Sequence, residues 1–488
     1  MVDYIKKNQR IINILIAVIT PLIGIGILLL VKGMTLQEIS IPCGDYNDEL
    51  TYYKQVEAMI RYGHPQGYFG YNESHAIIGN FDAWSITTFL HFAIAGKLFG
   101  WNYITPIIVN LVLWILTFVV TTVLLKPSIS QQAFISIAWI SCSTNIRYIF
   151  SCAPESLVTI LLLLFGVFFI RYNQNHNEIK WLVLADICLV YLTLMRGYYA
   201  LFVLLILASM LKETKRIDLK VIVQVIVALL SMIAFVLLVH YTFSPYFTPD
   251  INLSWLVSPK ALIKSLLVGF IETMQYILDA ILMKSIRGSW YLLYFLILPY
   301  IVYKCIKNRD WIYYSLLLSW CILISAMWTM YRIEESCRHI MICALVFAMI
   351  IVYIENKASA TLIVAIALVY ATWFSHDTVM YNTLPKIDEE QLEAISEGSE
   401  KLNASMQLTD NEWDNTIIWT RSTVYNELYA LPEGFGINCC LDEFVLNNFD
   451  SLKSKYVTAY YDGEMNDFLS KRCKLVASFG TTNVYEIR

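Results

Sequence analysis

Apolar segments long enough to cross a bilayer recur along the chain as far as residue 376. The first of them, residues 11–31, follows a basic N-terminus and has no small-residue cleavage site after it. About twenty apolar residues in a helix span the hydrocarbon core of a membrane, so we interpret this segment as a retained membrane helix and not as a signal peptide. The other predicted spans are 103–125, 131–150, 153–171, 181–195, 198–211, 219–243, 290–304, 311–329, 338–354 and 359–376.

Basic residues gather in alternate connections between these segments. They are Lys126, Arg171, Lys180, Lys212, Lys215, Arg216, Lys220, Lys304, Lys307, Arg309 and Lys357. Because basic loops remain in the cytoplasm, we place these connections and the N-terminus there. The first loop (33–102), the mostly apolar segment 244–289 and the C-terminal segment 377–488 then lie outside. A twelfth span at 84–99 would reverse the basic loops, so we expect an interfacial or re-entrant helix there and about eleven spans in all.

Composition agrees with a protein of the cell membrane. The 488 residues are 58% hydrophobic and 15% charged, and their mean hydropathy is +0.57. Soluble domains carry roughly a quarter charged residues. The net charge is −4 and no basic block is present, which argues against a nucleic-acid partner. Membrane lipids are therefore the general partner that we expect.

Only the C-terminal segment has the pattern of a soluble domain. Polar helices are expected at 388–408 and 464–472, and short strands at 417–419, 456–460, 475–476 and 483–487. We therefore predict an all-α polytopic membrane domain with interfacial helices over residues 1–376. A small exterior α/β domain follows over 377–488.

An acid cluster follows the first span. Asp45, Asp48 and Glu49 precede Tyr52 and further apolar residues at helical spacing, which predicts an amphipathic helix lying on the bilayer with acids at its N-terminus. The helix dipole keeps such acids ionised, as a proton acceptor or a metal ligand requires. The alternative is that they only cap the helix and form a solvated face.

Basic groups occur in later exterior turns. Residues 331–339 contain Arg332, Arg338 and His339, and guanidinium groups at this depth suit a lipid phosphate. The alternative is that Glu335 and Arg338 form an ordinary helix pair.

Further candidates have equally ordinary alternatives. Arg196 and Arg287 add positive charge to the same face, although Arg287 also suits a snorkelling residue. Glu155 is either part of the site or a first-turn helix acid. Glu73 and His75 in the first loop suit zinc or manganese, but they also read as exposed loop residues without a ligand.

Taken in order, these motifs resemble the GT-C glycosyltransferases, and among them the protein O-mannosyltransferases and bacterial aminoarabinose transferases. The matching stretches are Asp-Glu-Leu-Thr-Tyr at 48–52, residues 67–71, the 84–99 helix with its Leu-Phe-Gly end, Pro-Glu at 154–155, Thr-Leu-Met-Arg-Gly at 193–197, and Glu-Ser-Cys-Arg-His at 335–339. Three places depart from the family pattern: residues 80–84 replace its Lys/His-Pro-Pro-Leu, Gly197 stands where proline is usual, and His339 where tyrosine is usual.

The resemblance implies an inverting transfer of a sugar from a polyprenyl-phosphate donor to an exterior acceptor, which is an envelope glycan, a lipid or a protein. In this interpretation Asp48 is the general base, and Glu49 orients the acceptor or helps to hold a divalent metal. Arg332 and Arg338 neutralise the departing lipid phosphate, with Arg196 and Arg287 as secondary candidates.

Two other functions remain open from the sequence. A glycolipid transporter or flippase is expected to carry charges through the bilayer midplane, and Asp186 lies within a predicted span. An envelope-polysaccharide polymerase or ligase would also use an arginine-rich exterior site.

Overall fold

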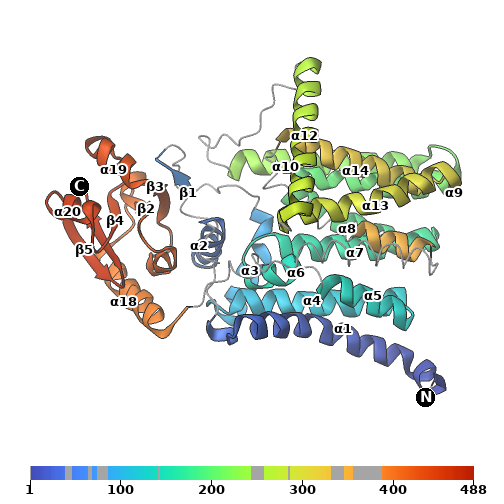
Figure 1. The fold of residues 1–488 in the computed structure, drawn as a ribbon, viewed down its shortest axis with the longest axis horizontal. Helices are drawn as coiled ribbons and strands as arrows, with labels where there is room; N and C mark the ends of the chain where they lie inside the picture. The colour runs from blue at the N-terminus through green and yellow to red at the C-terminus, as the bar shows by residue number, and fades with distance from the viewer. Residues whose placement is uncertain are drawn as a thin grey trace.

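The computed structural model describes residues 2–38, 47–63, 69–73, 86–140, 143–242, 258–283, 286–330, 346–355 and 387–487. A helical bundle and a sheet domain make up this structure, and helix α2 (Asn47–Tyr62) lies between them (Figure 1). The sheet domain comprises residues 387–487 and one strand from the first loop. The end of the bundle that faces it is called the sheet end below.

The bundle helices run along a common direction (Figure 1). They are α1 (Val2–Lys32), α4 (Thr105–Leu125), α5 (Ile129–Ile140), α7 (Glu155–Gln174), α8 (Ile179–Met195), α9 (Val203–Thr214), α10 (Leu219–Thr242), α13 (Ile286–Asn308), α14 (Trp311–Met330) and the helix Val346–Glu355. By length and composition, five helical segments of the described chain can cross a membrane: Asn8–Lys32, Thr105–Leu125, Glu155–Gln174, Gly197–Thr214 and Leu219–Leu238. The predicted multi-pass helical fold is confirmed, whereas the number of spans stays a prediction.

Polar side chains inside the bundle bond to neighbouring helices. Asn13 Nδ2 donates to Pro127 O at 2.7 Å, and Thr20 Oγ1 donates to Ser136 Oγ at 2.8 Å, which joins α1 to α5. Between α4 and α7, Trp114 Nε1 donates to Ser156 Oγ at 3.0 Å. Such bonds help to hold membrane helices together, because apolar side chains gain little by leaving lipid for each other.

The last part of the predicted span 131–150 departs from a regular α-helix in the structure. Helix α5 ends at Ile140, and α6 (Ser143–Arg147) and the 3-10 turn η3 (Tyr148–Phe150) follow. Asn110 of α4 explains how this irregular backbone is tolerated inside the protein. Its Nδ2 donates to the carbonyls of Tyr148, Ile149 and Ser151 at 3.3, 3.1 and 2.9 Å, and so supplies a donor that a regular helix would have provided.

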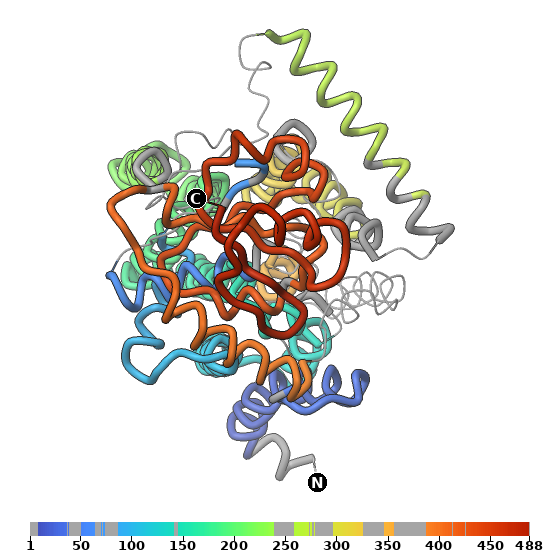
Figure 2. The backbone as a smooth tube through the Cα atoms, turned by 90° about the vertical axis from the view of Figure 1, so that its left-hand side faces the viewer, coloured from blue at the N-terminus to red at the C-terminus, as the bar shows by residue number. Residues whose placement is uncertain are grey.

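Two helices lie outside the regular bundle. Helix α3 (Leu90–Phe99) has 10 residues, too few to span a membrane, as expected for the 84–99 segment. Helix α12 (Pro259–Met283) runs across the direction of the bundle and stands out at its edge (Figures 1 and 2). Ile263, Leu267 and Ile271 are exposed along it, as expected of an interfacial helix.

The sheet domain contains a six-stranded sheet in the order β1-β3-β2-β4-β6-β5. Its strands are β1 (Phe69–Tyr71), β2 (Thr416–Thr420), β3 (Gly436–Cys440), β4 (Tyr456–Tyr460), β5 (Lys474–Phe479) and β6 (Thr482–Glu486). The pairs among β1, β3, β2 and β4 are parallel, and β6 is antiparallel to both neighbours. Helices α18 (Glu389–Ser405), α19 (Asp442–Asn448) and α20 (Glu464–Ser470) belong to the same domain.

The predicted α/β character of this domain is confirmed, and the sequence pattern missed two of its strands. Strand β3 is one of them. The other, β1, comes from the first loop and pairs with β3 from Phe69 opposite Ile437 to Tyr71 opposite Cys439. The first loop therefore contributes an edge strand to the sheet. The boundary that we expected at residue 377 remains a prediction.

One glycine in α18 permits close packing of this helix on β5. A Cβ at Gly398 would lie 2.4 Å from the Phe479 ring. We expect Gly398→Ala to lower the free energy of unfolding by about 1–3 kcal/mol through overpacking, despite the better helix propensity of alanine. The measurement is thermal unfolding of the full chain in detergent.

Gly26→Ala in α1 is the matched control, because nothing lies within 4 Å of the added methyl group. It should leave the melting temperature unchanged or raise it. Equal melting temperatures for the two variants would contradict the close packing of α18 on β5.

Candidate functional site

A buried ion pair lies at the sheet end of the bundle. Arg196 Nη2 donates to Glu155 Oε1 at 2.8 Å, and both side chains are only 1% exposed. Glu155 is the first residue of α7, and Arg196 follows the last residue of α8. The helices are antiparallel neighbours, so the acid lies at a positive helix end and the arginine at a negative one, which favours both charges.

Tyr198 contacts this pair, and a second buried arginine lies on α6, which packs against α7. Arg147 is buried and its guanidinium lies 5.6 Å from the centre of the Tyr148 ring. Tyr198 OH lies 3.5 Å from Arg196 Nη1, and its ring packs against Tyr199 with 4.5 Å between centroids. Glu155 and Arg196 thus form a buried pair, and Arg147 directly precedes the turn that Asn110 stabilises from α4. A cluster of this kind at a membrane boundary indicates function more often than packing alone.

Helix α2 carries the predicted catalytic acids in its first turn. The helix begins at Asn47, so Asp48 and Glu49 are its second and third residues, where free backbone N–H groups and the dipole favour anions. The structure describes the backbone of these two residues only. How their side chains meet the basic groups remains a prediction.

The predicted environment of α2 is wrong. The helix was expected to lie on the bilayer, but Tyr52, Val56 and Met59 are buried in protein. The Tyr52 ring packs on Phe89 with 5.2 Å between centroids. The amphipathic pattern was real. The apolar face of the helix is covered on the side of the bundle, and the opposite face is covered by the sheet domain.

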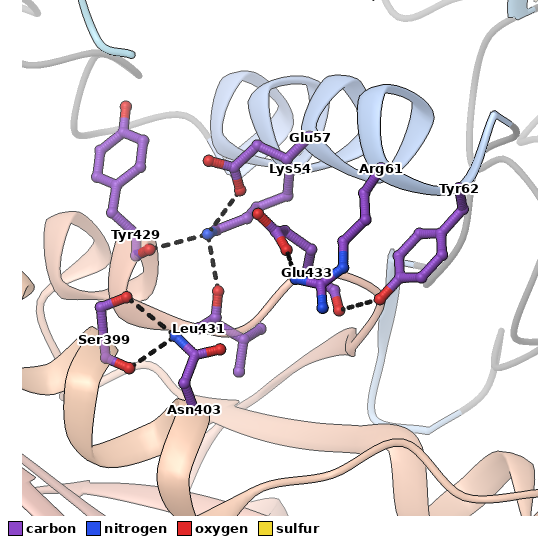
Figure 3. Close-up of polar contacts among 9 residues, drawn as sticks. All are labelled: Lys54, Glu57, Arg61, Tyr62, Ser399, Asn403, Tyr429, Leu431 and Glu433. Atoms are coloured by element: carbon purple, nitrogen blue, oxygen red, sulfur yellow. Dashed lines mark hydrogen bonds and ion pairs between the residues drawn. The ribbon is translucent and has the colours of Figure 1, made fainter. Parts of the chain in front are cut away.

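The side of α2 that faces the sheet domain is joined to it by charged groups (Figure 3). Lys54 Nζ donates to Tyr429 O, Leu431 O and Glu57 Oε2 at 2.8, 2.9 and 2.9 Å. Burial raises the pKa of the Glu57 carboxyl, and the Lys54 ammonium acts in the opposite direction. Lys54 was not predicted from the sequence, since one lysine on an amphipathic helix gives no sign of its partner.

Glu73 has a structural partner. Its carboxylate accepts hydrogen bonds from the backbone N–H of Lys453 at 2.9 and 3.1 Å, and from that of Ser454 at 2.7 Å. This arrangement ties the end of β1 to the segment before β4 and leaves Glu73 poorly suited to a metal. The described part of the chain contains no group of three His, Cys, Asp or Glu residues able to hold a metal ion.

Several predicted site residues cannot be placed against this cluster. Asp45, His75, Arg332, Arg338 and His339 lie outside the described residues. For Arg287, the second residue of α13, the structure describes only the backbone. Their convergence with Asp48 therefore stays a prediction.

The contribution of the buried ion pair to stability can be tested by mutation. We expect Arg196→Met to lower the free energy of unfolding by about 3–5 kcal/mol, because it leaves the Glu155 carboxylate buried without its counter-charge. The double variant Glu155→Gln/Arg196→Met should lose less than the sum of the single losses. Thermal unfolding of the purified chain in detergent measures all three.

Lys180→Met is the control, since Lys180 pairs with Glu178 at 3.0 Å on the surface. This change should cost less than about 1 kcal/mol. If Arg196→Met melts with the control, the pair does not hold the start of α7 against the end of α8.

The whole structure is similar to known membrane glycosyltransferases. An oligosaccharyltransferase from Archaeoglobus fulgidus, in its apo form, superimposes with a TM-score of 0.57 at 12% identity over 99% of this chain and 75% of that one. ArnT from Cupriavidus metallidurans, bound to undecaprenyl phosphate, gives a TM-score of 0.52 at 10% identity over 96% and 98%. The archaeal enzyme in complex with Zn and sulfate gives 0.51 at 12% identity over 98% and 72%.

No family model and no curated protein matches the sequence. At these identities the structural similarity establishes the fold but not the activity. The resemblance to GT-C enzymes inferred from the sequence is confirmed at that level. The chain therefore has the fold of the GT-C glycosyltransferases.

Proposed function

We propose that this protein is a membrane glycosyltransferase that transfers a sugar from a polyprenyl-phosphate donor to an acceptor on the exterior face of the cell membrane. The observation that carries the proposal is the similarity of nearly the whole chain to two different GT-C enzymes, one of them bound to undecaprenyl phosphate. The acid-bearing end of α2 lies at the sheet end of the bundle, which this proposal identifies with the exterior face.

The proposed reaction is an inverting displacement. The acceptor oxygen forms a bond to the anomeric carbon while the bond from that carbon to the phosphate oxygen breaks. The acceptor proton passes to Asp48, whose carboxylate is kept ionised by the first turn of α2. Glu49 orients the acceptor. The electron pair leaves with the lipid phosphate, whose charge Arg332, Arg338 and His339 stabilise.

Glu155 and Arg196 take a different part in this proposal from the donor contact that the sequence suggested. Each neutralises the other, and both are almost fully shielded from solvent. We assign them to holding the start of α7 against the end of α8 beneath the site. Arg287 remains a candidate for contact with the donor, whereas Tyr52, which the family motif also suggested, is buried against Phe89.

A metal is left outside the mechanism. Zinc is present in one structure of the archaeal neighbour, but the described residues of this chain do not supply a ligand set. If a divalent ion binds, Asp45, Asp48 and Glu49 are the acids available to it, and it would supply positive charge beside the phosphate.

Asp186 is the observation that favours a transporter instead. It lies within α8, and its Oδ2 accepts a hydrogen bond from Gln224 Nε2 of α10 at 2.8 Å. A single hydrogen-bonded acid between two helices is also what interhelical packing produces. A donor assay separates these functions and the polymerase alternative, because only the proposed transferase releases lipid phosphate from a monosaccharide donor.

The decisive variant is Asp48→Asn. Loss of the general base should lower transfer by about 10²–10⁴-fold, with donor binding retained because the basic residues are unchanged. The measurement is lipid phosphate released from a panel of polyprenyl-phosphate sugars by the purified protein.

Asp467→Asn is the matched control, an exposed acid in the first turn of α20 in the sheet domain. It should transfer at the wild-type rate. Retained transfer in a well-expressed Asp48→Asn protein would remove Asp48 from its proposed role.

A further inference from the structure

Lys54 is bound on all its donors at the junction between α2 and the sheet domain. An ammonium has three N–H donors, and here they meet two backbone carbonyls of the sheet domain and the Glu57 carboxylate (Figure 3). The side chain is 10% exposed. A lysine held in this way has little freedom to change partner without leaving buried groups unsatisfied.

The two carbonyls belong to a surface shaped to receive α2. Leu431 caps the C-terminal end of the 3-10 turn η6 (Tyr425–Ala430), and the carbonyl groups at this end attract a cation. Gly434 follows with a φ of +91°, and a Cβ there would lie 3.2 Å from the Tyr62 ring of α2. Tyr62 OH donates to Glu433 O at 3.1 Å, and Arg61 pairs with the Glu433 carboxylate.

The opposite side of α2 is packed just as closely. Tyr53 lies between the bundle and the sheet domain, with its ring centroid 5.0 Å from those of Trp101 and Tyr429. At Gly96 of α3 a Cβ would come within 2.3 Å of Ile60. A displacement of the sheet domain must therefore either move α2 as well or break the contacts between the two. Movement of α2 would in turn break the packing of α2 on the bundle side.

Two further connections hold the chain on either side of α2. Before the helix, Glu38 O accepts a hydrogen bond from Ile387 N at 2.8 Å, where the sheet domain begins. After the helix, β1 is paired with β3. The segment that carries Asp48 is thus attached to the sheet domain before, along and after the acid helix.

From this arrangement we propose that Lys54 is a positioning residue, through which the sheet domain sets the place of Asp48. The proposal rests on the transferase function proposed above. Asp48 lies six positions before Lys54 on the same helix, or about 9 Å along its axis at 1.5 Å per residue. A misplacement of about 1 Å at a reacting group can lower a rate by about 10²-fold. The sheet domain thereby contributes to transfer without touching the reacting atoms.

The first measurement is independent of catalysis. In the full chain in detergent, hydrogen exchange of the α2 amides should rise by about tenfold or more in Lys54→Met, because two carbonyls each lose a donor and Glu57 loses its counter-charge. Amides of α7 and α8 should keep the wild-type rate. Unchanged exchange in α2, or a rise throughout the chain, overturns the proposal.

The second measurement is transfer by the same variants. Lys54→Met should lower kcat by about tenfold or more while KM for the polyprenyl-phosphate sugar stays within about twofold. Lys54→Arg, which keeps the charge and the donors, should recover part of kcat. A wild-type kcat in Lys54→Met, with α2 loosened, overturns the positioning role.

Lys401→Met is the matched control for both measurements. Lys401 likewise donates to a backbone carbonyl, Ser478 O at 2.7 Å, and pairs with Glu397. These contacts stay within the sheet domain, so α2 exchange and kcat should not change. If the wild-type protein transfers no sugar, the function proposed above fails, and hydrogen exchange still decides whether Lys54 holds α2.

Discussion

The arrangement of this protein depends on α2 being covered on two sides. Its apolar side chains meet α3 at the sheet end of the bundle, where Tyr52 packs on Phe89. Its charged side chains meet carbonyl and carboxylate oxygens of the sheet domain, with Lys54 at the centre. The helix has 16 residues, close to the length below which isolated helices are marginal in water. The acid end of the helix is therefore placed by tertiary contacts.

The polar groups of the bundle fall into two kinds. Some join neighbouring segments within the apolar interior, as Thr20 does between α1 and α5 and Asn13 between α1 and the α4–α5 connection. Others, notably Glu155 and Arg196, gather where helices end and the backbone becomes irregular. A buried ion pair adds little net stability compared with apolar packing, but it strongly disfavours arrangements in which either charge is alone. We interpret the pair as fixing one arrangement of the start of α7 against the end of α8.

Hydropathy was sufficient to predict most of the bundle, because membrane helices must satisfy their backbone internally and so appear as long apolar runs. It failed at residues 148–150, where the 3-10 turn depends on the amide of Asn110 in another helix. The strands β2, β4, β5 and β6 were recognisable from alternating or apolar patterns. Strand β1 was not, because Phe69–Tyr71 is too short to show a period. For the site, sequence identified Asp48, Glu155 and Arg196 as residue types at helix ends, while the partner of Lys54 required the structure.

The pairing of β1 with β3 has a consequence for biosynthesis. The backbone N–H of Glu73, just after β1, donates to the Asn438 side chain of β3 across 365 positions of the chain. Strand β1 is therefore synthesised long before β3, its partner in the sheet. Until they meet, β3 presents an open edge, and such edges promote pairing between chains. Contacts this distant also slow folding, since a long loop must close first. A nascent chain of this protein should therefore be most prone to aggregate after its membrane helices are inserted and before β1 of the first loop pairs with β3.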